Sequence, residues 1–96
     1  MRSTLEIPAT HPAFAGHFPG FPLLPGAMLL DEMLRVIEEA RGIDLRNWQV
    51  ASAKFLSAVR PSETLVLEHE ATIAGSIRFT IHVDDRKVAS GALHEL

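Results

Sequence analysis

A single helix with a wide apolar surface is the feature that most restricts the fold of this chain. Pro25-Gly26 predicts its start, because proline is tolerated in the first helical turn, and Gly42 predicts its end after Arg41. Apolar side chains cover more than half of its circumference, which is wider than the stripe of an ordinary surface helix. These side chains are Leu29, Leu30, Met33, Leu34, Val36, Ile37 and Ala40. We therefore expect a sheet to wrap around this helix.

The rest of the chain supplies strands for such a sheet. We expect strands over residues 3–7, 48–59, 64–73, 77–84 and 87–96. In two of them apolar residues alternate with polar ones, which predicts one buried and one solvent-facing side. The alternating residues are Leu65, Leu67, Ala71 and Ile73, then Ile77, Phe79, Ile81 and Val83. The pattern predicts one α+β domain over residues 1–96, with an antiparallel sheet around one long central helix.

A single sheet with one helix has a small core and exposed edges. Two copies that pair into a larger sheet would relieve both problems, so we expect a homodimer.

Composition excludes several kinds of protein. The chain has no cysteine, which excludes disulfides, thiolate zinc sites and a cysteine nucleophile. Its net charge of −3 and the lack of a Lys/Arg cluster argue against a nucleic-acid surface. No apolar stretch approaches the roughly 20 residues of a membrane span, and no secretory leader is recognisable. We expect a cytoplasmic protein.

A stretch dense in proline and glycine, from Thr10 to Pro25, precedes the helix and predicts an ordered loop. His17 lies within it between Gly16 and Phe18-Pro19-Gly20, so its imidazole is carried by a backbone with little freedom. Histidine titrates near neutral pH, with an unperturbed pKa of about 6.5, and can accept a proton there. His17 is therefore a candidate general base.

The start of the helix adds two candidates. Gly26 lies where unpaired backbone N–H groups and the positive end of the helix dipole would polarise a thioester carbonyl. Asp31 lies five residues further, at the edge of the apolar stripe beside Ala27 and Leu34, whereas Glu32 is rotated about 100° towards the polar side. We expect Asp31 to be the more buried acid, with a pKa raised enough to donate a proton to a departing hydroxyl.

The run GHFPGFPLLPG over residues 16–26, followed by Asp31, resembles the signature of the 3-hydroxyacyl-acyl-carrier-protein dehydratases of bacterial fatty-acid synthesis. That family has a His-Phe-Pro-Gly run, two spaced prolines, a Pro-Gly at the helix start and an acid fourteen positions after the histidine. Looser similarity continues through AKF at 53–55, VRPSE at 59–63 and RKVA at 86–89. The chain resembles a short member of this family.

The resemblance implies a hot-dog fold, a dimer with two active sites at its interface, and no metal or organic cofactor. It implies that His17 is the catalytic histidine, that Asp31 is the acid contributed by the other subunit, and that the Gly26 amide holds the thioester carbonyl. The predicted reaction removes water from a 3-hydroxyacyl thioester on acyl carrier protein or coenzyme A, in fatty-acid or related acyl-chain synthesis. The acyl chain would run beside the helix.

Two other functions stay open from the residues. A hot-dog thioesterase would use an acid and a polarised carbonyl to activate water against the thioester, and a non-catalytic acyl-binding or interaction module would keep the loop without turnover. For an acidic carrier protein, Lys54, Arg60 and Arg78 are candidates for a basic docking patch. His69 and His82 could face each other across neighbouring strands, but a third ligand is lacking, so no metal site is predicted.

Overall fold

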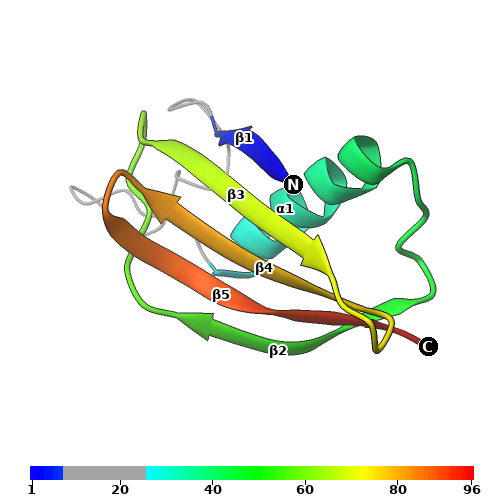
Figure 1. The fold of residues 1–96 in the computed structure, drawn as a ribbon. Coiled ribbons are helices and arrows are strands. Elements are labelled where there is room, and N and C mark those ends of the chain that lie inside the picture. The colour runs from blue at the N-terminus through cyan, green and yellow to red at the C-terminus, as the bar shows by residue number, and fades with distance from the viewer. Residues whose placement is uncertain (8–25) are drawn as a thin grey trace.

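The computed structural model of the chain describes residues 1–7 and 26–96, and these form one helix and one five-stranded antiparallel sheet (Figure 1). The elements in chain order are β1 (Arg2–Glu6), α1 (Gly26–Arg41), β2 (Trp48–Phe55), β3 (Thr64–Ala71), β4 (Ser76–Val83) and β5 (Arg86–Glu95). The strand order in the sheet is β1-β3-β4-β5-β2, so β1 and β2 are the edge strands. The α+β class and the order of elements predicted from the sequence are both confirmed.

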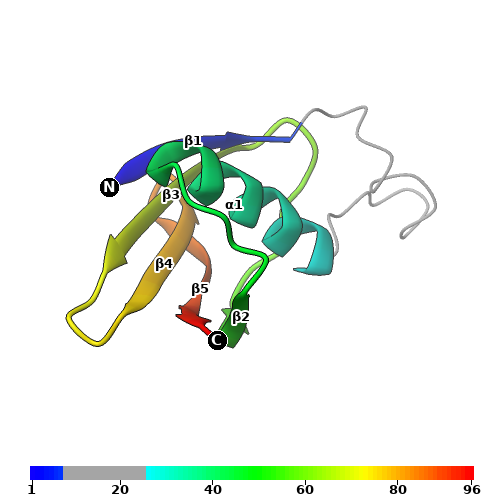
Figure 2. The ribbon, with the colours of Figure 1, turned by 90° about the vertical axis from the view of Figure 1, so that its right-hand side faces the viewer.

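The helix α1 lies across one face of a curved sheet (Figure 2). Leu29, Met33 and Ile37 are its buried residues and point into the core. Leu30, Leu34 and Val36 are partly buried and pack against the same core. Within one chain the sheet therefore buries only a stripe of α1. Other apolar side chains of the helix lie beside this stripe and are only partly covered.

The alternation in β3 and β4 puts one side of each strand against α1. Leu65 and Leu67 on β3 and Ile77, Phe79 and Ile81 on β4 are buried. The predicted pattern fails at the end of β3, because the strand stops at Ala71 and the chain turns through Thr72–Ser76. Ala71 is consequently exposed, and Ile73 projects fully into solvent in the turn.

The strand β2 is shorter than the predicted range of 48–59. It ends at Phe55 because the next two backbone N–H groups, of Leu56 and Ser57, both donate to the Val88 carbonyl, at 2.8 and 3.3 Å. Two donors on one acceptor cannot continue a regular ladder. Val59 then turns into the core, where it is buried.

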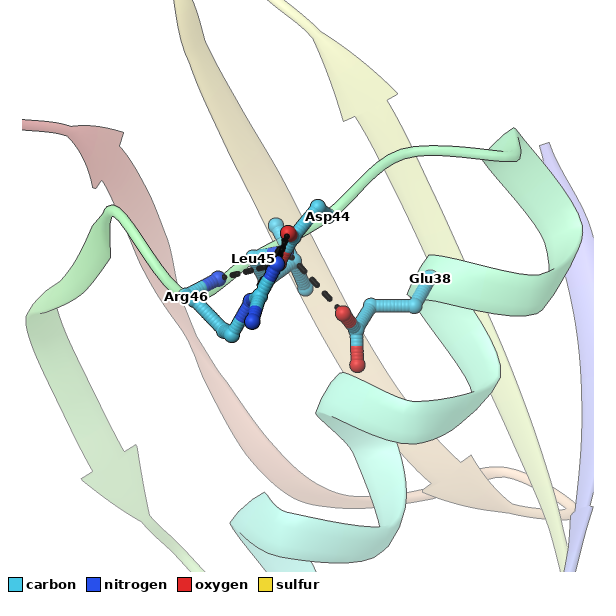
Figure 3. A network of polar contacts seen from close by, with 4 residues as sticks. All are labelled: Glu38, Asp44, Leu45 and Arg46. Atoms are coloured by element: carbon cyan, nitrogen blue, oxygen red, sulfur yellow. Dashed lines mark hydrogen bonds and ion pairs between the residues drawn. The ribbon is translucent and has the colours of Figure 1, made fainter.

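The helix ends as the sequence predicts. Gly42 has a positive φ of 63°, and its N–H donates to the Glu38 carbonyl at 2.8 Å. The connection to β2 is fixed by carboxylates: Glu38 Oε2 accepts from the Leu45 N–H at 3.0 Å, and Asp44 accepts from the Arg46 N–H at 2.9 Å (Figure 3). Hydrogen bonds from Arg46 also hold the pKa of Asp44 below its usual range.

Candidate active site

The N-terminal end of α1 borders an open pocket of about 480 Å³. Its lining residues come from the start of the helix and from the end of β2 with the segment that follows it. They are Gly26, Leu29, Phe55, Ser57, Ala58 and Val59. This pocket contains Gly26, which the sequence predicts to hold a thioester carbonyl.

Gly26 and Phe55 lie in close contact in this pocket. A β carbon built on Gly26 would come within 2.9 Å of Phe55 Cζ and 3.0 Å of Cε1. Carbon atoms normally approach to about 3.5–4.0 Å, so only glycine fits here without displacing the ring. The sequence analysis gave Phe55 no role beyond the AKF similarity at 53–55, because its contact with Gly26 joins residues far apart in the chain.

Asp31 lies five residues along α1 from Gly26, and it is exposed. This differs from the predicted burial. The sheet packs on the side of the helix that carries Leu29 and Met33. Of the two expected neighbours of Asp31, Leu34 is only partly buried and Ala27 is exposed. Burial of Asp31 therefore needs a surface beyond the described part of one chain.

The other predicted catalytic residue, His17, lies outside the described residues, as do the loop from Thr10 to Pro25 and its phenylalanines. The structure therefore describes only the part of the candidate site that comes from α1, from the end of β2 and from the segment after it. It consists of a pocket at a helix N-terminus, with Gly26 on its wall and a carboxylate further along the same helix.

The remaining acids of α1 have structural contacts. Arg35 pairs with Glu32 at 2.8 Å and with Glu39 at 3.3 Å, as expected of a solvated helix side. Glu38 instead accepts from the Leu45 N–H, as described above. None of these contacts points to catalysis.

A second polar cluster lies at the opposite end of the helix. Arg41 Nε donates to His69 Nδ1 at 2.8 Å, and Arg41 Nη2 donates to the His69 carbonyl at 3.1 Å. Ser3 Oγ lies 3.4 Å from His69 Nε2, and the His69 side chain is only 1% exposed. Burial lowers the pKa of His69, and the positive charges of Arg41 and of the Met1 amino group lower it further.

The neutral His69 ring carries its proton on Nε2, because Nδ1 accepts the hydrogen bond from Arg41.

The two strand histidines do not face each other. His69 pairs with the inward-facing Phe79 in the sheet register, whereas His82 pairs with Val66 and lies 3.7 Å from Glu68 on the outer side. In the described part of the chain, no group of three or more His, Asp or Glu residues is arranged to hold a metal ion.

The three basic residues proposed for carrier docking are separated. Lys54 and Arg60 are exposed and directly adjoin the pocket residues Phe55 and Val59 in sequence. Lys54 and Phe55 are neighbours on β2, so their side chains point to opposite faces of the sheet. Arg78 lines a different hollow, together with Glu68 and Glu70. Its place beside two carboxylates on β3 makes it a poor member of a basic patch.

Comparison with known proteins identifies the family. Residues 1–92 match the family model of the ApeI-like dehydratases, described as ApeI dehydratase. The chain belongs to the ApeI-like dehydratase family. The resemblance drawn from residues 16–31 is thereby confirmed.

Individual relatives agree with the family match. The 3-hydroxyacyl-[acyl-carrier-protein] dehydratase FabZ of Chlamydia trachomatis is 30% identical over 92% of this chain and 66% of its own length. FabZ of Enterococcus faecalis is 30% identical over 92% of this chain and 70% of its own length. For FabZ of Hydrogenobaculum sp. the match is 32% identical but reaches only half of that protein. The chain thus spans about half to 70% of these relatives.

Solved structures confirm the hot-dog fold. The dehydratase heterocomplex ApeI:P from Xenorhabdus doucetiae superposes with a TM-score of 0.75 at 26% identity, over 97% of this chain and 83% of the other. A point mutant of the fluoroacetyl-CoA-specific thioesterase FlK has a TM-score of 0.70 at 13% identity, over 100% and 87% of the two chains. The second likeness concerns the fold alone.

Proposed function

We propose that this chain is a hydro-lyase that converts a 3-hydroxyacyl thioester, carried on acyl carrier protein, to the trans-2-enoyl thioester in fatty-acid or related acyl-chain synthesis. The family match over residues 1–92 is the observation that carries this proposal. The pocket at the start of α1 supports it, because Gly26 lines a space open to a ligand.

The reaction assigns a role to each candidate residue. The His17 imidazole accepts the proton from C2, and the electrons of that C–H bond form the C2=C3 double bond. The C3–O bond breaks, and the Asp31 carboxyl gives its proton to the departing hydroxyl, which leaves as water. The Gly26 N–H at the helix start stabilises the negative charge that develops on the thioester oxygen. No redox change occurs, so the step needs no oxidant or reductant.

A homodimer is part of the proposal, with Asp31 of one copy completing the site that contains His17 of the other. The exposed edge strand β2 supports it, since every residue of β2 except Trp48 is exposed. An edge strand of this length presents unpaired backbone groups that a second strand can bond. Sedimentation should give a dimer, and a monomer that is active by itself would contradict the shared site.

A heteromer is the alternative assembly, because the Xenorhabdus relative is a heterocomplex. Catalysis by the purified chain alone would support the homodimer. We also propose that the chain is a single domain that works in the cytoplasm. No helix in the described ranges has the length and apolar character needed to span a membrane.

One assay tests the function. The purified chain is incubated with 3-hydroxyacyl thioesters of several lengths, on acyl carrier protein and on coenzyme A, while enoyl absorbance and free thiol are recorded together. We expect enoyl product without thiol. Thiol without enoyl product would identify a thioesterase, and neither signal at any length would identify a binding module.

The carrier preference has a separate test. Charge reversal of Lys54 and Arg60 should raise KM for the carrier-bound substrate, because acyl carrier proteins are acidic, and should leave KM for the coenzyme A substrate nearly unchanged. Reversal of Arg78 is the matched control, since Arg78 lies beside Glu68 and Glu70. If KM for the carrier-bound substrate is equal in all three variants, Lys54 and Arg60 do not form a docking patch for the carrier.

A further inference from the structure

We propose that Phe55 selects the substrate at C2, so that the site takes 3-hydroxyacyl thioesters without a substituent on C2 and disfavours those with a methyl group there. The inference rests on the proposed dehydration and on Gly26 as the residue that holds the thioester carbonyl. It adds a residue that sets specificity to the acid, base and carbonyl-binding group of that proposal.

The contact between Phe55 and Gly26 is the first observation. Three ring atoms, Cζ, Cε1 and Cε2, lie 2.9, 3.0 and 3.2 Å from the place where a β carbon on Gly26 would be. All three belong to the outer end of the ring, so its tip occupies the space that a side chain on residue 26 would need. One added carbon already overfills this space.

The proposed hydrogen bond from Gly26 to the thioester sets where C2 of a bound substrate would lie. A carbonyl oxygen that accepts a hydrogen bond from the Gly26 N–H lies about 2.9 Å from that nitrogen. C2 is bonded directly to the carbonyl carbon, so it lies within a few ångströms of the same backbone. A methyl group on C2 and the Phe55 ring therefore compete for space at one wall of the pocket, and Leu29 and Val59 close other sides of it.

Phe55 has a backbone fixed by strand pairing and a side chain that is half exposed. Phe55 pairs with Ala89 of β5, and the next two N–H groups donate to the Val88 carbonyl. The Phe55 side chain is nevertheless 49% exposed, so it contributes little to the core. The strand fixes the backbone from which the ring projects, and the size of the side chain decides how much room is left beside Gly26.

The test compares two substrates in one enzyme. The kcat/KM values for a 3-hydroxyacyl and a 2-methyl-3-hydroxyacyl N-acetylcysteamine thioester of equal chain length are measured by enoyl absorbance. Phe55→Ala should raise the ratio of branched to unbranched kcat/KM on the order of 10-fold or more, the scale of discrimination that one methyl group gives in an apolar pocket. Phe55→Leu should give a smaller rise, and Phe55→Trp should lower the ratio.

Leu56→Ala is the matched control. Leu56 is 50% exposed, almost the same as Phe55, but it does not line the pocket, so its loss should leave the ratio unchanged. If the wild-type chain dehydrates the unbranched substrate and every Phe55 variant keeps the wild-type ratio, the selection by Phe55 is wrong while the proposed function stands. If the wild-type chain dehydrates neither substrate, the proposed function fails and the inference fails with it.

Discussion

The two ends of α1 differ in what surrounds them. At the C-terminal end, Arg41 makes two hydrogen bonds to the buried His69 of β3, and Gly42 and Glu38 close the last turn. At the N-terminal end, Gly26 borders an open pocket, Phe55 is half exposed and Asp31 is exposed. One end of the helix is therefore fixed to the sheet by hydrogen bonds, whereas the other borders an open pocket. If that pocket is the active site as proposed, substitutions at the C-terminal end should change stability and substitutions at the N-terminal end should change activity.

The largest effect is expected at Asp31. Asp31→Asn removes the proposed proton donor and should lower kcat by a factor on the order of 10²–10⁴ in the enoyl assay. Because Asp31 is exposed, thermal unfolding should change little. Glu39→Gln, also on the exposed side of α1, is the control and should retain nearly full activity. A normal rate for Asp31→Asn would show that the open end does not carry the chemistry.

A large loss of stability is expected at the other end. Arg41→Leu leaves the Nδ1 atom of buried His69 without its donor, which should lower the free energy of unfolding by about 1–3 kcal/mol in denaturant titration. Arg35→Leu breaks only exposed ion pairs and should cost about 0–1 kcal/mol. If Arg41→Leu remains fully folded yet loses activity as strongly as Asp31→Asn, the two ends of α1 do not have separate roles.

A smaller effect is expected from Gly26→Ala. This change keeps the backbone N–H but adds the carbon that meets the Phe55 ring, so kcat/KM should fall several-fold as the ring moves into the pocket. The double variant Gly26→Ala/Phe55→Ala should recover part of the loss, because close neighbours are not additive. Strictly additive effects would mean that the contact between the two residues has no consequence for turnover.

The mildest expected effect is a pH dependence of stability at His69. Its pKa is lowered in the folded chain, so the unfolded chain binds more protons once the pH falls below about 6.5. This contribution to stability is complete above that pH and is lost as the pH decreases towards the folded pKa. Denaturant titrations over this range should show a steeper loss for wild type than for His69→Gln. If stability falls with pH equally in wild type and His69→Gln, His69 is not the cause of the pH dependence.

The sequence was sufficient for the helix and the order in which the strands appear, because each depends on local signals. Pro25-Gly26 and Gly42 mark the helix ends, and the alternation through Phe79 marks a half-buried strand. The sequence-based prediction was wrong where a contact between residues distant in sequence decides where a strand ends. The Val88 carbonyl ends β2 at Phe55, far earlier in the chain, and no local pattern contains that information.

The candidate site was predictable to a similar extent. Gly26 and Asp31 could be chosen from their spacing after His17, and the structure adds the pocket beside Gly26. Burial of Asp31 could not be judged, because a helical wheel shows which residues neighbour it and not which surface covers it. His69 was missed as a core residue because it is polar, although it occupies the inward position that follows Leu65 and Leu67.

The exposure of Phe55 has a consequence for how freely this position can be substituted. A side chain that is half in solvent at a strand end can be replaced with little loss of folding free energy, unlike Met33 or Phe79, which are almost completely buried. If Phe55 selects the substrate at C2 as proposed, substrate preference and folding stability therefore depend on different residues of this chain.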